Sequence, residues 1–153
     1  MQAEAKRSYR IRCARVSEAR EFARLTTELG YPATASQIAP RLRALLPLTD
    51  HFVAVAAETR GHLLGWVAAE RRFLLHDEPR VEIIGLVVDA AARQRGIGQA
   101  LVRAVEEWAV DQGVGRIAVR SNVTRRESHP FYERLGYRRE KTQHAYVRTL
   151  DRG

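Results

Sequence analysis

The chain has 153 residues, 45% of them hydrophobic, which is enough for one domain with its own core and argues against a disordered chain. Its formal net charge of +8, from 26 Lys and Arg against 18 Asp and Glu, suits a phosphate-bearing ligand or a nucleic acid without choosing between them. The single cysteine, Cys13, excludes an intrachain disulfide, and no apolar run approaches the length of a membrane span. Because the N-terminus also lacks the apolar core of a signal peptide, we expect one cytoplasmic domain, residues 1–153, with no membrane partner.

The first half of the chain predicts one strand, two helices and a hairpin. Alternating residues 9–13 indicate the strand, Ser17 is the expected N-cap of the first helix, and the second helix is expected from Ser36 to just before Pro47. Two apolar runs, 52–57 and 62–69, flank a turn that closes with a glycine and predict an antiparallel hairpin. The two helices also leave a helix-turn-helix open, although Arg41 and Arg43 are few basic residues for a recognition helix.

The second half predicts a strand at 81–88, a long amphipathic helix from Ile97 to Gln112, and a short strand around 117–119. A short helix is expected from Ser128 to Leu135, followed by two final strands, one from Tyr137 onward and one at 143–150. Helices and strands alternate without a linker or repeat. We therefore predict a single α/β (α+β) domain built on a mixed sheet.

The segment between the strand at 81–88 and the long helix has the properties of an anion site. The first N–H groups of a helix have no partners within the helix, and the helix dipole places partial positive charge there. Gly96 and Gly98 remove the Cβ atoms that would keep a phosphate away, and Arg93 and Arg95 add full charges. The dinucleotide fingerprint fails because Leu101 stands where a third glycine is needed, and no nucleotide P-loop is present.

Three motifs in register resemble the GNAT superfamily of acetyl-CoA-dependent N-acetyltransferases. They are the Arg-x-x-Gly-x-Gly turn at 93–98, Ser121-Asn122, and the run His129-Pro-Phe-Tyr-Glu-Arg-Leu-Gly-Tyr137. The resemblance covers the second half of the chain well and the first half only by the order of its elements. It implies a single-domain GNAT-like fold, with a mixed, mostly antiparallel twisted sheet flanked by about four helices.

The same resemblance implies the activity and the residues that serve it. The expected reaction moves an acetyl group from acetyl-CoA, a cosubstrate, to a primary amine by direct transfer in a ternary complex. A small-molecule amine is favoured over a protein amine, and a homodimer is left open. The residues implied to bind the cofactor are Leu86, Val87, Val88, Arg93, Gln94, Arg95, Gly96, Ile97, Gly98, Gln99, Asn122 and Tyr132.

Glu82 and Tyr132 are the expected catalytic residues. Glu82 is the single charged residue of the strand 81–88, and a lone acid in a buried strand needs a partner, a solvent-lined cleft or a function. It is therefore the candidate general base, and the alternative is a residue at an exposed rim of the strand. The resemblance makes Tyr132 the general acid that protonates the leaving thiolate, with a core aromatic residue as the alternative.

Gly85 and the histidines leave further alternatives. A glycine inside a strand marks a bulge with close approach of a ligand, or it makes room for a bulky neighbour such as Trp66 or Trp108. The five histidines are scattered and lack metal-ligand spacing with Cys13, so we expect no metal, and nothing indicates an activated Cys13. Two other functions stay open: a basic nucleic-acid-binding module that uses the N-terminal helix pair, and a non-catalytic acyl-CoA-binding regulator on the same fold.

Overall fold

The computed structural model describes residues 8–120 and 128–153. They belong to two compact units, residues 1–120 and 121–153, which are described separately, so the expected single domain stays a prediction. The first unit contains, in chain order, β1 (Tyr9–Cys13), η1 (Val16–Glu18), α1 (Ala19–Glu28), α2 (Ala35–Leu45), β2 (His51–Glu58), β3 (Leu63–Arg72), β4 (Arg80–Val88), η2 (Ala90–Ala92), α3 (Ile97–Asp111) and β5 (Ile117–Val119). In the described residues no helix combines the length and the apolar character that crossing a membrane requires.

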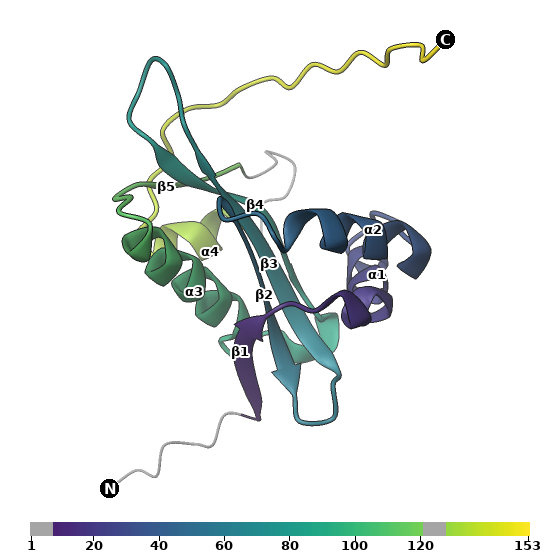
Figure 1. Ribbon diagram of the computed structural model, residues 1–153. Helices are drawn as coiled ribbons and strands as arrows, with labels where there is room; N and C mark the ends of the chain where they lie inside the picture. Colours follow the sequence, from purple (N-terminus) through teal and green to yellow (C-terminus); the bar gives the residue numbers. More distant parts are fainter. Residues whose placement is uncertain (1–7, 121–127) are drawn as a thin grey trace, which may run out of the picture. The chain divides into compact units, whose positions relative to one another are not determined.

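A five-stranded sheet forms the centre of the first unit (Figure 1). Its strands lie in the order β1-β2-β3-β4-β5, and each of the first four is antiparallel to its neighbour. β5 runs parallel to β4, because α3 carries the chain back across the sheet between them. The predicted fold class, α/β (α+β) with a mixed and mostly antiparallel sheet, is confirmed.

α1 and α2 pack on one face of this sheet (Figure 1). Phe22, Leu25 and Leu42 from the helices form one buried cluster with Val53 and Val55 of β2. Burying such a cluster is the main source of stability in a domain of this size. The helix pair therefore covers the sheet, and it does not form a free helix-turn-helix.

The starts of both helices differ in detail from the predictions. The expected N-cap Ser17 lies inside the 3-10 turn η1, and Glu18 is the N-cap of α1. α2 begins at Ala35, one residue before the expected start, and Thr34 is its N-cap: the Thr34 hydroxyl accepts a hydrogen bond from the Gln37 N–H at 3.2 Å, and the Thr34 N–H donates to Gln37 Oε1 at 3.0 Å. This reciprocal pair is a capping box, which needs a spacing of three residues between the threonine and the glutamine.

α3 packs on the opposite face, against β2, β3 and β4 (Figure 1). It ends at Asp111, one residue before the predicted end, and is followed by Gly113, whose φ of 74° is rare for a residue with a side chain. The helix is amphipathic as predicted, although Trp108 is only half-buried and stacks on Phe52 with ring centroids 5.4 Å apart. The buried residues of the helix are Ile97, Leu101, Val102, Val105 and Ala109.

In residues 128–153, the described part of the second unit, the one helix is α4 (Ser128–Arg134), which ends before Gly136 with its φ of 91°. The two final strands predicted from Tyr137 onward and at 143–150 are wrong, because residues 138–153 contain no strand. Sequence alternation defines two faces, but a strand exists only where a neighbour accepts its backbone hydrogen bonds. Tyr146 and Val147 are accordingly 91% and 93% exposed.

Candidate active site

A β-bulge interrupts β4 and is followed by the loss of its β5 neighbour. Ala68 of β3 lies opposite Gly85, whereas the next residue, Ala69, lies opposite Ile83, so Ile84 is an extra residue on β4. The pairing of β4 with β5 extends from Val81 only as far as Ile83. Beyond that point, the β5 side of β4 has no strand neighbour among the described residues, which leaves its backbone groups for another partner.

Gly85 is explained by its aromatic neighbour. A Cβ atom at this position would lie 2.8 Å from two ring carbons of Trp66, which no real contact allows. Trp66 belongs to the face of the sheet that α1 and α2 cover. The glycine therefore makes room for the indole ring, and the bulge itself is placed at Ile84.

The turn between η2 and α3 is followed by backbone N–H groups that have no partner within the helix. The first intrahelical bond runs from the Ala100 N–H to the Gly96 carbonyl at 3.0 Å, so the N–H groups of the residues between them, 97–99, have no helical partner. Gly96 has a φ of 77°, and a Cβ atom on it would meet nothing within 4 Å. Gln94 also has a positive φ, 67°, which is uncommon for a residue with a side chain.

Charge and shape both suit this turn to an anion. The exposed Arg93 and Arg95 flank it, and the guanidinium of Arg95 bonds the hydroxyl of Ser8. α3 is a 15-residue helix whose dipole ends here, and this favours negative charge at the same place. A groove of about 910 Å³ begins at the turn and follows α3 along β1, lined by side chains that include Tyr9, Cys13, Phe52, Gln99, Arg103 and Trp108.

Glu82 is buried, with 4% of its surface exposed, so the alternative of an exposed rim residue is wrong. Its two oxygens meet two guanidinium groups: Arg72 Nη1 at 2.6 Å from Oε2 and Arg120 Nε at 3.1 Å from Oε1. Glu82 lies directly opposite Glu70 of β3, which in turn lies opposite His51 of β2. The buried acid thus has the partners that its burial requires.

These polar residues form one strip across the sheet. His51 Nε2 lies 3.2 Å from Glu70 Oε2, and Arg72 Nε lies 3.6 Å from Glu70 Oε1. The strip ends at Glu82, one residue before β4 and β5 stop pairing. Arg72 and Arg120 were not predicted from the sequence, because they come from β3 and from the residue after β5 and no spacing along the chain relates them to Glu82.

Tyr132 lies on α4 in the second unit. Its ring packs edge-on against Phe131 and Tyr137, with centroids 5.0 and 5.9 Å away. Burial raises the pKa of the Tyr132 phenol above its ordinary value of 10.0, which keeps the hydroxyl protonated at neutral pH. Asn122, the other expected ligand-binding residue of this unit, lies outside the described residues.

The chain is similar in sequence to curated proteins that include N-acetyltransferases. The glucosamine 6-phosphate N-acetyltransferase 1 of Oryza sativa subsp. japonica is 33% identical over 143 residues, 89% of this chain and 85% of that protein. The aminoalkylphosphonate N-acetyltransferase of Salmonella typhimurium is 32% identical over 115 residues, 74% of this chain and 71% of that protein. Other curated relatives are longer, and the chain spans only 28% of the length of one of them.

Solved structures share the fold of this chain. The structure of AAC(6')-Iy in complex with the bisubstrate analog CoA-S-monomethyl-acetylneamine superimposes with a TM-score of 0.80 at 18% identity, covering 93% of this chain and 99% of that one. The model of the acetyltransferase (GNAT) family matches residues 17–137, most of the chain. The chain belongs to the acetyltransferase (GNAT) family.

Proposed function

We propose that this protein is an N-acetyltransferase that moves an acetyl group from acetyl-CoA to a primary amine by direct transfer in a ternary complex. The proposal rests on three features that follow one another along the chain. β4 has no β5 neighbour after Ile83, the turn follows β4 and η2, and α3 then begins with N–H groups that have no helical partner. An extended ligand with a phosphate at one end suits this arrangement.

In this proposal the binding residues divide between the two ends of the ligand. The turn residues Arg93, Gln94, Arg95, Gly96, Ile97, Gly98 and Gln99 hold the pyrophosphate, chiefly through backbone N–H groups. The backbone of Leu86, Val87 and Val88 holds the pantetheine arm and the acetyl carbonyl along the free side of β4. Asn122 adds a contact to the arm.

Acetyl-CoA would supply the activated acetyl group as a thioester. An alkyl amine with a pKa near that of lysine, ~10.4, is over three units from its neutral form at pH 7, so its deprotonation costs about 4 kcal/mol. Glu82 takes this proton, directly or through a water molecule, because a carboxylate retains lone pairs beyond the two used by Arg72 and Arg120. Tyr132 donates its phenolic proton to the departing thiolate.

The acceptor that we propose is a small amine carrying an anionic group. The two curated relatives described above are named for acceptors that join an amine to a phosphate or a phosphonate. In this chain two guanidinium groups, of Arg72 and Arg120, lie beside the proposed base. An amine at Glu82 would therefore place an attached anion next to positive charge.

The test is CoA release by the purified protein with a panel of amines matched in size, with and without a phosphate or carboxylate group. We expect turnover with the anionic amines, and we expect acetyl-CoA at 100 times its Kd to add ~2.7 kcal/mol to the free energy of unfolding. Stabilisation by acetyl-CoA without turnover on any amine would favour the non-catalytic regulator. Stabilisation by duplex DNA and not by acetyl-CoA would favour the nucleic-acid-binding module.

A further inference from the structure

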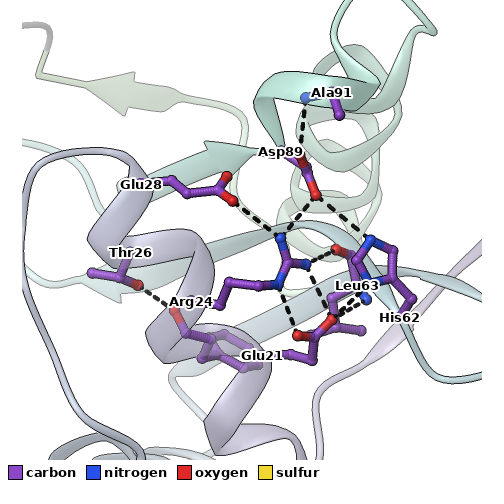
Figure 2. Close-up of polar contacts among 9 residues, drawn as sticks. Glu21, Arg24, Thr26, Glu28, His62, Leu63, Asp89 and Ala91 are labelled. Atoms are coloured by element: carbon purple, nitrogen blue, oxygen red, sulfur yellow. Dashed lines mark hydrogen bonds and ion pairs between the residues drawn. The ribbon is translucent and has the colours of Figure 1, made fainter.

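Arg24 of α1 lies at the centre of an ion-pair cluster that joins α1 to the ends of β3 and β4 (Figure 2). Its Nε and Nη2 bond both oxygens of Glu21, at 2.8 and 3.0 Å. Nη1 bonds Asp89 Oδ2 at 2.9 Å and Glu28 Oε1 at 3.3 Å, and Nη2 also bonds the Leu63 carbonyl at 2.8 Å. A guanidinium has five N–H donors, and these five contacts match that number, so its orientation is fixed in a way that a lysine cannot reproduce.

Asp89 connects this cluster to the proposed phosphate turn. It follows β4 directly, is 6% exposed, and caps η2 by accepting the Ala91 N–H on Oδ1 at 2.9 Å. Its own N–H donates to the Leu64 carbonyl at 2.8 Å. With Oδ2 taken by Arg24, all its polar groups have defined partners, and the direction in which the chain leaves β4 is set four residues before Arg93.

The charge state of the cluster agrees with this geometry. Burial, the largest influence, acts to raise the pKa of Asp89, but the Ala91 N–H and the Arg24 guanidinium hold the pKa below its ordinary value of 3.8. The hydrogen bonds from Arg24 lower the pKa of Glu21, against the effect of burial. Both carboxylates therefore stay ionised at neutral pH and keep Arg24 in place.

The turn itself has little else to hold it. Its residues from Arg93 to Gly96 are all exposed, and two of them, Gln94 and Gly96, have positive φ. The flanking residues Ala92 and Ile97 are 2% and 1% exposed and anchor the turn at its two ends, and between them Arg95 bonds the exposed Ser8. A short exposed turn with a costly backbone angle, here at Gln94, keeps one shape only if its ends are fixed.

We propose that Arg24 is a positioning residue that acts through Asp89 to hold the phosphate turn in the shape that binds CoA. This inference rests on the proposed function, because it assigns the turn to CoA. Arg24 touches no part of the ligand in this account. Its effect on binding is transmitted from α1 to the end of β4.

Two variants test the Arg24–Asp89 pair by replacing one partner at a time. Asp89→Asn keeps an oxygen for the Ala91 N–H but removes the charge that pairs with Arg24, and Arg24→Lys keeps the charge but not the five-donor geometry. For both we expect the calorimetric Kd of CoA to rise about tenfold, which corresponds to ~1.4 kcal/mol. The Kd of pantetheine, which has no phosphate to reach the turn, should not change.

Arg12→Lys is the matched control. Arg12 makes a similar two-pronged pair with the buried Glu18, at 2.7 and 3.0 Å, but it joins β1 to η1 and has no contact with Asp89. This variant should lower the thermal midpoint about as much as Arg24→Lys while leaving the CoA Kd unchanged. The comparison separates a general loss of stability from a displaced turn.

The outcomes distinguish the two proposals. If the parent protein does not bind CoA, the proposed function is wrong whatever the variants do. If the parent binds CoA and both test variants bind it equally tightly, only the positioning role is wrong. The positioning role is also wrong if CoA and pantetheine weaken together, or if Arg12→Lys weakens CoA as much as Arg24→Lys does.

Discussion

Glu82 is both a buried charge that needs ion-pair partners and the proposed general base. Removing a partner from a buried ion pair is strongly destabilising, because it leaves an uncompensated charge. Arg72 and Arg120, which pair with the carboxylate, meet this structural demand. Its position, one residue before the end of the β4–β5 pairing, is what connects it to the proposed chemistry.

Replacing Glu82 by glutamine separates these two roles at the scale of the residue. We expect Glu82→Gln to lower kcat by about 10²- to 10⁴-fold, the usual contribution of a general base, with the Kd of acetyl-CoA unchanged. The remaining rate should rise with pH, because deprotonation of the amine then depends on the solution. The measurement is the pH–rate profile of the variant beside that of the parent.

Glu70→Gln is the control for this experiment, because Glu70 belongs to the same polar strip and pairs with His51 and Arg72. It should disturb the strip without removing the proposed base, so its pH–rate profile should keep the shape of the parent's. An unchanged profile in Glu82→Gln as well would give Glu82 a purely structural role.

At the scale of elements, β4, the turn and α3 are consecutive segments that together form the proposed CoA site. The bulge at Ile84 and the short pairing with β5 leave one side of the strand free, and the strand ends where η2 and the turn begin. α3 then packs on the same sheet through its buried stripe. The start of α3 is therefore held in place against the same sheet whose strand β4 would bind the rest of the ligand.

Gly98→Val tests whether the start of α3 holds a phosphate. Gly98 lies in the first turn of the helix and is not among the positive-φ residues, so valine costs little backbone strain there and has a better helix propensity than glycine. Its branched side chain should nevertheless block the approach of a phosphate. We expect calorimetry to show CoA binding lost and pantetheine binding kept.

Gly115→Val provides the matching glycine replacement beyond the far end of α3. A Cβ atom there would meet nothing within 4 Å, and the φ of Gly115 is not in the left-handed region. This variant should bind CoA like the parent. Equally tight CoA binding by Gly98→Val would mean that the glycines of the turn hold no phosphate.

At the scale of the first unit, ion pairs tie helices to the sheet where apolar packing ends. The core cluster lies under α1 and α2, and Arg24 extends the contact of α1 to the ends of β3 and β4. Its partners Glu21 and Asp89 carry pKa values below their ordinary values of 4.5 and 3.8. Their ionisation therefore contributes to the stability of the whole unit.

Acid should weaken the first unit through this cluster. Because the folded-state pKa values are lowered, the folded state binds fewer protons than the unfolded state as these groups titrate. The contribution is complete above the ordinary pKa values and is lost as pH falls through the lowered ones. Urea midpoints measured from about pH 6 to about pH 3 should fall, and the Glu21→Gln variant should show a smaller fall. An equal fall in parent and variant would contradict the assignment.

The sequence alone was sufficient for the elements whose signals are local. The strand at 81–88, the glycine turn, the helix that follows and the short helix at 128 were placed within one or two residues. Hydrophobic period, unpaired helix ends and glycines at positive φ all act over three or four residues. The anion-binding role that we propose for the turn rests on the same local signals.

Tertiary structure decided the properties that depend on residues far apart in the chain. The partners of Glu82 come from β3 and from the residue after β5, the size of Trp66 explains Gly85, and Arg24 meets Asp89 across 65 positions. The C-terminal segment shows that a local pattern does not by itself predict a strand. Its alternation at 143–150 predicts two faces, yet pairing requires a neighbouring strand, which no local pattern supplies.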